Sequence, residues 1–291
     1  MCPPDHFAVK YSINPWMDPR KWTAEAGLLS NRSGRQWQMF YEALLTSGAD
    51  IELVEATPDL PDLVFTANAA VVLDRKALLA RFRHAERRRE EPVFSCVLHS
   101  MRRQGALDQI AKLPAKVILE GAGDCIWDWS RNHFWLGYGQ RSDYASRDVI
   151  ADFFGVDCVA LELADPRFYH LDTAFCALAF GEVIYYPTAF TPAARRAIED
   201  RIHPFQLIPL GRDDAHSFAA NLVSLGRQIV LSNCSQKLRR QLEERQYTVV
   251  ETPLDAFQQS GGSACCLTLR TDHPILRSCR SAQRSAPALA N

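Results

Sequence analysis

The chain contains a structural unit that recurs at nearly even intervals. Polar or glycine-containing loops around Asn68, Asp124, Asp172, Asn221 and Gly262 stand 56, 48, 49 and 41 residues apart. Each loop precedes segments typical of short β-strands joined by a turn, and amphipathic helices lie between these sets. Repeated units of this kind bury their apolar faces against their neighbours, which predicts a closed ring. The predicted fold class is therefore α/β, a five-bladed α/β propeller of ββαβ repeats. The alternative is an ordinary α+β domain with accidental spacing.

The predicted strands and helices have recognisable ends. The strand pairs are Ala69–Leu73 with Ala77–Phe82, Cys125–Trp129 with His133–Gly137, Thr173–Ala179 with Glu182–Tyr186, and Asn221–Leu225 with Gln228–Leu231, while Cys265–Leu269 begins a fifth set. Five helices are predicted: one after Ser33 that ends at Gly48, one through Phe94 that ends at Gly105, one through Tyr144 that ends at Gly155, and two capped by Thr191 and Ser235.

Length and composition favour one soluble domain. A chain of 291 residues can bury a sizeable core and is near the upper limit for an undivided domain. We find no interdomain linker, so residues 1–272 are predicted to form a single catalytic domain. The short tail over residues 273–291 is rich in Ala, Ser and Pro and is predicted to be disordered.

Charge and cysteine usage exclude several classes of protein. The net charge of −1 offers no electrostatic case for nucleic acid or an anionic membrane, and the basic run Arg81 to Arg89 is interpreted as a solvated face. Nine scattered cysteines without a CxxC pair argue against a disulfide framework and a zinc ribbon. The N-terminus has no signal-peptide pattern, and no apolar run is long enough to span a bilayer. We expect a cytoplasmic protein.

The loops of the repeat carry a candidate catalytic group. If they converge on the ring axis, they bring together a cysteine, a histidine and several acidic or amide side chains: Asp62, Asn68, Glu120, Asp124, His170, Asp172, Asn221 and Cys266. A thiol, a histidine and carboxylates around one cavity are typical of nucleophilic thiol chemistry, and the acidic groups point to a positively charged substrate. Asp124 and Asp172 are accordingly predicted to contact it.

Each of these residues also has a structural interpretation. The cysteines could be small buried hydrophobes, His170 could bond a backbone carbonyl, and Glu120 could belong to a plain turn. Asn68 could cap a local turn. A metal site built on His170, Asp172 and a cysteine is a further alternative, although the usual paired spacings of metal ligands are absent.

Several segments, in order, resemble one known family. They are Met1 to His6, Ile13 to Met17, Pro61 to Ala69, Glu120 to Asp124, Tyr169 to Thr173 and Gly261 to Thr268. Together they resemble the bacterial arginine dihydrolases and related dimethylarginine dimethylaminohydrolase-like proteins. These belong to the guanidine-modifying, or pentein, superfamily, whose fold is a five-bladed α/β propeller.

The resemblance implies roles for individual residues. Cys266 matches the nucleophile, rather than its neighbour Cys265, and His170 matches the general acid/base. Glu120 matches the acid that holds the guanidinium and steers the histidine. The implied substrate contacts are Asp62, Arg81 and Arg141, the last two with the substrate carboxylate, and Asn14. At Asn68, dimethylargininases and arginine deiminases carry a carboxylate, whereas arginine dihydrolases carry asparagine.

The resemblance also implies a reaction. Covalent hydrolysis at the guanidinium carbon of arginine would give ornithine, ammonia and carbon dioxide, or citrulline from methylated arginine. No metal or organic cofactor is expected, and the expected partner is a small cationic guanidino amino acid. The alternatives are deimination that stops at citrulline, an amidinotransferase with an amine acceptor, and a non-catalytic arginine-binding protein. The chain could be a monomer or a homo-oligomer.

Overall fold

The computed structural model describes residues 1–272, and the tail predicted to be disordered lies outside the described residues. Within that range the chain is a mixed α/β fold with eight α-helices and four small sheets. The strands are β1 (Ala70–Leu73), β2 (Lys76–Leu79), β3 (Gln109–Lys112), β4 (Cys125–Asp128), β5 (His133–Tyr138), β6 (Cys158–Glu162), β7 (Phe175–Ala177), β8 (Val183–Tyr185), β9 (Leu207–Pro209), β10 (Val223–Leu225), β11 (Gln228–Leu231) and β12 (Thr248–Glu251). The helices are α1 (Pro19–Ala24), α2 (Ala26–Thr46), α3 (Glu90–Arg103), α4 (Ser146–Phe154), α5 (Pro192–Glu199), α6 (Arg212–His216), α7 (Gln236–Glu243) and α8 (Asp255–Gln258).

The four sheets have the same topology. In each, the first two strands pair antiparallel, and the third pairs parallel to the second. In the first sheet, for example, Val71 lies opposite Leu78, and Leu78 lies opposite Ala111. A parallel pair needs a crossover connection, and α3, α4, α5 and α7 lie within the four crossovers. The predicted ββαβ repeat is thus confirmed for four units.

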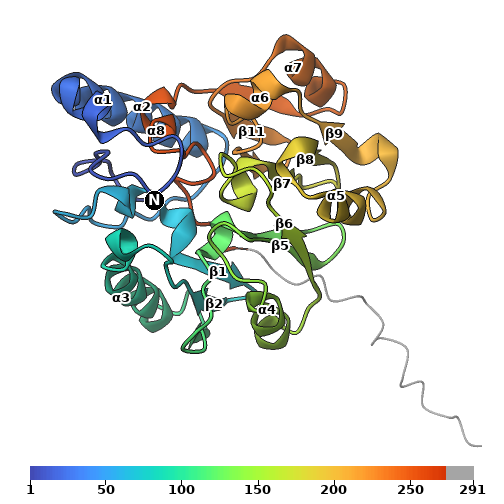
Figure 1. The fold of residues 1–291 in the computed structure, drawn as a ribbon, viewed down its shortest axis with the longest axis horizontal. Coiled ribbons are helices and arrows are strands. Elements are labelled where there is room, and N and C mark those ends of the chain that lie inside the picture. The colour runs from blue at the N-terminus through green and yellow to red at the C-terminus, as the bar shows by residue number, and fades with distance from the viewer. Residues whose placement is uncertain (273–291) are drawn as a thin grey trace, which may run out of the picture.

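The units are arranged around a centre (Figure 1). Seen down the short axis, the sheet units follow one another round the molecule, and α1, α2 and α8 fill the remaining sector. The largest core cluster joins consecutive units, with Trp135, Ile184 and Ile229 all fully buried. The apolar faces therefore pack between neighbouring units, as expected for a ring.

The segment predicted as the fifth strand set is different. Cys265–Leu269 is not a strand in the structure; it begins in a turn, in which Thr268 N donates to Cys265 O at 3.0 Å. The physical reason is that the Cys266 N–H is taken up by the side chain of Asn221, at 3.2 Å, instead of by a neighbouring strand. The prediction of a fifth strand set was therefore wrong, and residues 1–272 contain four sheets.

The five predicted helices correspond to α2, α3, α4, α5 and α7. Thr191 and Ser235 are N-caps, and their side chains accept hydrogen bonds from the third residue along the chain. The helices that the sequence did not reveal, α1, α6 and α8, have 6, 5 and 4 residues, too few to show a 3.6-residue period. None of the helices in residues 1–272 combines the length and apolar character needed to cross a membrane.

Candidate active site

The loops at the centre of the ring are joined by hydrogen bonds that run from unit to unit. Going round the ring, Asn68 Nδ2 donates to Glu120 O at 2.9 Å, and Leu171 N donates to Asp124 Oδ1 at 3.0 Å. Asn221 Nδ2 then donates to Asp172 O at 3.1 Å, and Cys266 N donates to Asn221 Oδ1 at 3.2 Å. Finally, Ala67 N donates to Cys266 O at 3.2 Å. The last bond returns to the first loop. The predicted convergence of the five loops is therefore confirmed.

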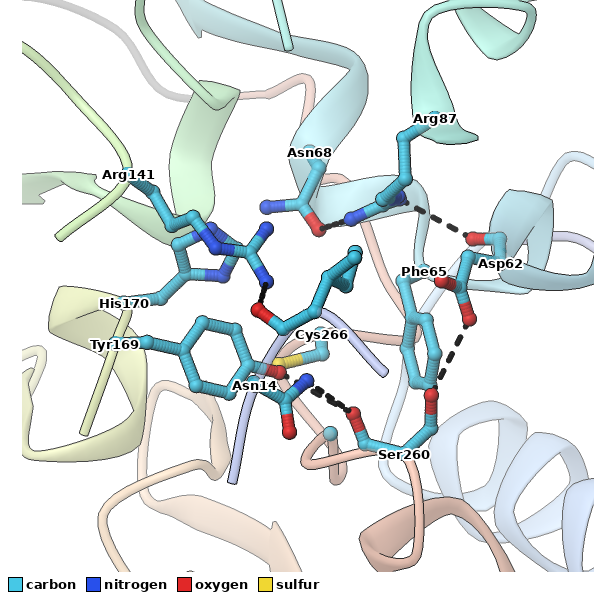
Figure 2. A pocket seen from close by; sticks show the side chains of 12 residues that line it. Asn14, Asp62, Phe65, Asn68, Arg87, Arg141, Tyr169, His170, Ser260 and Cys266 are labelled. Carbon is cyan, nitrogen blue, oxygen red and sulfur yellow. Dashed lines mark hydrogen bonds between the residues drawn. The ribbon is translucent and has the colours of Figure 1, made fainter. Parts of the chain in front are cut away.

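A small cavity lies among these loops (Figure 2). Six residues predicted for the site line it: Asn14, Asp62, Asn68, Arg141, His170 and Cys266. The other lining residues are Ile13, Phe65, Arg87, Tyr169, Ser260 and Gly262. Its volume of about 10 Å³ leaves room for about one water molecule in this closed form.

The thiol of Cys266 is held by two polar side chains. It donates to Asp172 Oδ2 at 3.1 Å and accepts a hydrogen bond from Asn221 Nδ2, also at 3.1 Å. Burial, and then the nearby Asp172, raise the pKa of the Cys266 thiol well above its ordinary value. The thiol is therefore neutral in the unliganded protein. A cation placed in the cavity would favour the thiolate, as would the hydrogen bond from Asn221.

Asp172 lies behind the thiol. Burial raises the pKa of its carboxyl to about 7, although the hydrogen bond from Cys266 opposes this shift. Its second oxygen, Oδ1, is buried and has no hydrogen-bond partner among the described residues. With its pKa close to neutrality and a direct hydrogen bond to sulfur, this carboxyl can accept the thiol proton.

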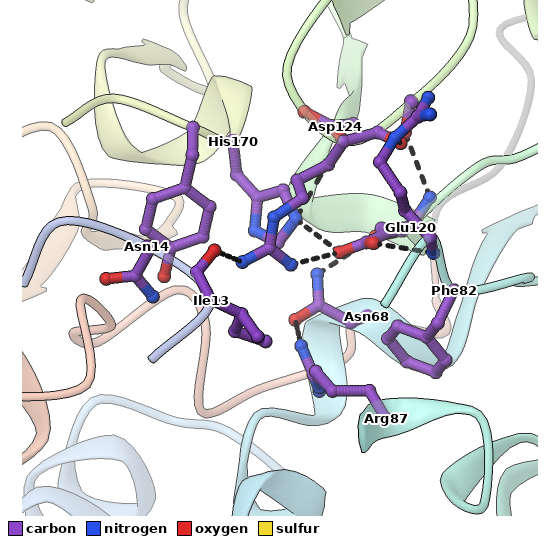
Figure 3. A network of polar contacts seen from close by, with 12 residues as sticks. Ile13, Asn14, Asn68, Phe82, Arg87, Glu120, Asp124 and His170 are labelled. Atoms are coloured by element: carbon purple, nitrogen blue, oxygen red, sulfur yellow. Dashed lines mark hydrogen bonds and ion pairs between the residues drawn. The ribbon is translucent and has the colours of Figure 1, made fainter. Parts of the chain in front are cut away.

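The imidazole of His170 is oriented by a buried carboxylate (Figure 3). Its Nε2 lies 2.8 Å from Glu120 Oε2, and the same oxygen accepts from Arg141 Nη1 at 2.9 Å. Burial opposes ionisation of Glu120, but Arg141 and the hydrogen bond from His170 outweigh it and hold the pKa of the carboxyl well below its usual range. Glu120 is thus a permanent anion that can stabilise a protonated His170.

Asp62 supplies a carboxylate to the cavity wall. It is 2 % exposed, and it accepts hydrogen bonds from Tyr11 Oη at 2.8 Å and Ser260 Oγ at 3.2 Å. No Lys, Arg or His among residues 1–272 lies within ion-pair distance of it. A buried carboxylate without a cationic partner is costly, so the cavity is electrostatically suited to a cation.

Asn68 is held between two units. Its Oδ1 accepts from Arg87 Nη1 at 2.9 Å, while its Nδ2 donates to the Glu120 carbonyl. Arg87 in turn forms two hydrogen bonds to the carboxylate of Glu90, at 2.9 and 2.7 Å, and both side chains are buried. Asn68 therefore presents no charge to the cavity, and its position is set by the Arg87–Glu90 pair.

Two glycines in the Glu120–Asp124 loop allow this close packing. Gly121 has a φ of +65°, and a Cβ there would lie 2.7 Å from the Ala67 carbonyl oxygen. At Gly123 a Cβ would collide with the amide nitrogen of Asn68. The loop is therefore more than a plain turn, because it lets the backbone of one unit approach the side chain of the next.

Four predicted site residues lie outside the cavity lining. Glu120 lies behind His170, as described above. Arg81 donates to the carbonyls of Leu113, Pro114 and Val117, which occupy its guanidinium. Asp124 accepts from Ser142 Oγ at 2.7 Å and supports the loops, and Asp172 holds the thiol. Arg81, Asp124 and Asp172 do not line the cavity, and their polar groups bond other residues. Their contact with the substrate stays a prediction.

Arg87 is the main residue that the sequence did not reveal. It lies within the basic run Arg81 to Arg89 that was interpreted as a solvated face, yet it is only 3 % exposed. Its guanidinium lies 4.5 Å from the centre of the Phe82 ring. The available signal was Glu90, three residues later, which is well spaced to pair with Arg87 on one turn of helix.

The N-terminal segment covers the cavity. Arg141 Nη2 donates to Ile13 O at 2.9 Å, and Asn14 Nδ2 donates to Ser260 O at 3.0 Å. Beyond them, Trp16 Nε1 donates to Arg167 O at 2.7 Å. Asn14 thus lines the cavity as predicted, but its amide is engaged in holding this segment in place.

The sequence matches a family model described as "N,N dimethylarginine dimethylhydrolase, eukaryotic" over residues 4–271. A bifunctional arginine dihydrolase/ornithine cyclodeaminase of Synechocystis sp. is 41% identical over 276 residues, which cover 95% of this chain and 38% of the relative. An N(G),N(G)-dimethylarginine dimethylaminohydrolase of Mycobacterium tuberculosis is 35% identical over 274 residues, 94% of this chain and 85% of the relative. The chain thus spans less than half the length of the bifunctional relatives.

Solved structures agree with this comparison. The N-terminal domain of a cyanobacterial arginine dihydrolase, a cysteine-to-serine variant bound to substrate, has a TM-score of 0.89 and 40% identity, covering 95% of this chain and 98% of that one. An asparagine-to-serine variant of the same domain, covalently bound to a reaction intermediate, has the same TM-score. A dimethylarginine dimethylaminohydrolase adduct, at 19% identity and a TM-score of 0.69, shares the fold.

Proposed function

The chain belongs to the N,N-dimethylarginine dimethylhydrolase family, and from this membership we propose that it hydrolyses the guanidinium group of free arginine through a covalent intermediate on Cys266. The observation that carries the proposal is the composition of the cavity wall. It combines a nucleophilic thiol, a histidine paired with a buried anion, and the unpaired carboxylate of Asp62. A guanidinium cation would provide the positively charged partner that the Asp62 carboxylate lacks, and it would stabilise the Cys266 thiolate.

The first step forms a bond between sulfur and the guanidinium carbon. The proton of the Cys266 thiol passes to Asp172, its hydrogen-bond acceptor, and the thiolate attacks. The bond from that carbon to a terminal nitrogen then breaks. His170, protonated beside Glu120, gives its proton to the departing ammonia. The product of this step is an amidino thioether on Cys266.

The second step reverses these roles. His170, now neutral, takes a proton from water, and the resulting hydroxide adds to the same carbon. The carbon–sulfur bond breaks, citrulline forms, and the thiol regains its proton. A second round at the ureido carbon of citrulline consumes another water and yields ornithine, carbon dioxide and a second ammonia.

Asn68 favours arginine dihydrolysis over a reaction that stops at citrulline. An amide is uncharged and can both donate and accept, so it suits a neutral ureido group better than a carboxylate does. The identities of 40% and 41% to the bifunctional arginine dihydrolases, against 35% to the dimethylarginine hydrolase, support the same choice. Arg87 and Arg141 line the cavity, whereas Arg81 does not, and they supply the positive charges that face the substrate carboxylate in this proposal.

Substrate access requires the N-terminal segment to move. The closed cavity holds about one water, so arginine can enter only after the contacts of Ile13 and Asn14 with Arg141 and Ser260 open. Closure afterwards would exclude bulk water from the thioether intermediate.

The five-bladed propeller is also retained as a proposal. The hydrogen bond from Ala67 N to Cys266 O closes the ring, and the sector of α2 and α8 takes the place of the fifth blade without a sheet of its own.

Product identification by mass spectrometry tests the proposed function. We expect the protein to convert arginine into ornithine with two ammonias released for each arginine, and not to release dimethylamine from asymmetric dimethylarginine. Citrulline as the end product would contradict the second round, and dimethylamine release would support the dimethylargininase alternative. Transfer of the amidino group to an added amine such as glycine would establish an amidinotransferase instead.

A further inference from the structure

The side chain of Asn221 contacts the nucleophile at two points. Asn221 lies in the loop before β10 and is completely buried. Its Oδ1 accepts a hydrogen bond from Cys266 N at 3.2 Å, and its Nδ2 donates to Cys266 Sγ at 3.1 Å. A single amide therefore fixes the backbone of Cys266 and also donates to the sulfur itself.

The orientation of this amide is set by its other contacts. Nδ2 also donates to the main-chain carbonyl of Asp172 at 3.1 Å, so each of its two hydrogens has an acceptor. Exchanging the amide oxygen and nitrogen would place N–H against the Cys266 N–H, and the oxygen against the Asp172 carbonyl. The backbone is held too, since the Asn221 carbonyl accepts from Cys265 N at 3.4 Å and its N–H donates to Phe218 O at 2.9 Å. The donor to sulfur is thus in place before the reaction begins.

Two hydrogen-bond donors favour the charged form of the sulfur. Burial, and then Asp172, raise the pKa of the Cys266 thiol, whereas the main-chain N–H of Ser263 and the side chain of Asn221 lower it. In a buried site, a fixed N–H donor stabilises a developing negative charge much more than it would in water, as in an oxyanion hole. Asn221 can serve the sulfur in this way.

A donor to sulfur affects the two steps of the proposed reaction unequally. During attack on the guanidinium carbon, stabilising the thiolate increases its amount but makes each thiolate less nucleophilic, so the two effects partly cancel. During breakdown of the thioether the sulfur leaves as a thiolate, and a thiol of lower pKa leaves faster. No opposing effect operates there, so the contact should matter most in breakdown.

We infer that Asn221 is a further catalytic residue, whose N–H stabilises the sulfur of Cys266 as it leaves the covalent intermediate. This inference rests on the proposed hydrolysis. After hydroxide has added to the carbon, the carbon–sulfur bond breaks and its electron pair passes to sulfur, which faces the Asn221 N–H. The carbon–oxygen bond becomes the product carbonyl as its hydroxyl proton is released to water. Asp172 then returns to sulfur the proton that it took in the first step.

Asn221→Asp tests this role with a side chain of the same shape. A carboxylate has no donor, and a carboxyl has one proton, which the Asp172 carbonyl oxygen accepts better than sulfur does. The acceptor for the Cys266 N–H is kept in both forms. Intact-protein mass spectrometry after rapid quenching, in a single turnover of arginine, measures the formation and decay of the covalent adduct. We expect decay to slow about tenfold, as for a lost hydrogen bond to a charged group, and formation only about threefold.

Thr66→Val is the matched control. Thr66 Oγ1 donates to Leu267 O at 3.1 Å, so this variant also removes a buried hydrogen bond to the loop of Cys266, but one that does not involve the sulfur. The ratio of its decay rate to its formation rate should equal that of the original protein.

Asn221→Ala also lacks the donor, and it keeps the test decisive if Asn221→Asp fails to fold. It should show the same selective slowing of decay. The inference is overturned if a folded Asn221 variant slows both steps equally or neither, or if Thr66→Val lowers the ratio as much. An original protein that forms no adduct with arginine would refute the proposed function and this inference together. An adduct whose decay does not respond to Asn221 would remove the inference alone.

Discussion

The carboxylate of Glu120 and the imidazole of His170 meet in a hydrogen bond of 2.8 Å between Oε2 and Nε2, and both side chains are removed from solvent. The two residues lie fifty positions apart in the sequence and belong to neighbouring units of the ring. Because Arg141 keeps Glu120 ionised, the carboxylate is held as an anion that bonds and orients the imidazole of His170. This relationship is the basis of the first prediction.

Glu120→Gln should lower kcat by about 10²- to 10⁴-fold, because a neutral amide cannot stabilise the protonated imidazole. The pH profile of kcat should also shift, since the buried carboxylate that bonds the imidazole is gone. Steady-state ammonia release measured from pH 5 to 9 checks this. Glu243→Gln on the surface of α7 is the control, and an unaltered kcat and pH profile in Glu120→Gln would refute the role.

The two adjacent cysteines should respond very differently to substitution. Cys266→Ser should reduce turnover by about 10³-fold or more, because the attacking thiolate is lost, whereas Cys265→Ser should remain active. Mass spectrometry after treatment with an alkylating arginine analogue should find the label on Cys266. Full activity of Cys266→Ser, or labelling confined to Cys265, would contradict the covalent mechanism.

Asn68→Asp should change the product more than the rate of the first step. The carboxylate cannot donate to the Glu120 carbonyl and would repel a ureido oxygen, so turnover of citrulline should fall about tenfold, or ~1.4 kcal/mol. The ratio of citrulline to ornithine formed from arginine, measured by mass spectrometry, checks this. An unchanged ratio would show that the amide does not select the end product.

Arg87→Lys should destabilise the fold as well as weaken substrate binding. Lysine cannot reproduce the two-pronged contact with Glu90, which would be left poorly paired in the interior at a cost of ~3 kcal/mol. Urea denaturation and the KM for arginine measure the two effects. Arg89→Lys, at an exposed position of the same basic run, should change neither, and equal behaviour of the two variants would argue against a special role for Arg87.

Asp172→Asn should alter the dependence of stability on pH. Because the pKa of Asp172 is raised to about 7 from an ordinary 3.8, the folded state keeps a proton that the unfolded state loses. The free energy of unfolding should therefore fall as pH rises between these values, by up to ~1.4 kcal/mol per pH unit from this group. The buried Asp124, whose pKa is raised to about 6, adds a fall of the same sign.

Urea denaturation of the original protein and of Asp172→Asn at several values between pH 4 and pH 8 isolates the contribution of Asp172. The free energy of unfolding, plotted against pH, should fall less steeply for Asp172→Asn than for the original protein over this range. Parallel curves would mean that Asp172 is ionised in the folded protein throughout.

The repeat, the helix ends and most of the catalytic group could be predicted from the sequence alone. Local signals sufficed, because the apolar periods, the caps at Thr191 and Ser235, and the even spacing of the loops are properties of short segments. The resemblance to a family added the choice of Cys266 over Cys265. The same local reasoning wrongly predicted a strand at Cys265–Leu269. A local pattern does not reveal that the distant Asn221 side chain accepts a hydrogen bond from the Cys266 N–H.

Only the tertiary structure decided which charged groups lie in the cavity. Arg81 and Arg87 are six residues apart in one basic run. Arg87 is buried and bonds Asn68 and Glu90, whereas the guanidinium of Arg81 donates to backbone carbonyls. Asp62 and Asp172 look alike in the sequence, yet one faces the cavity and the other holds the thiol. The physical reason is that burial and the choice of partner depend on contacts between residues that are distant along the chain.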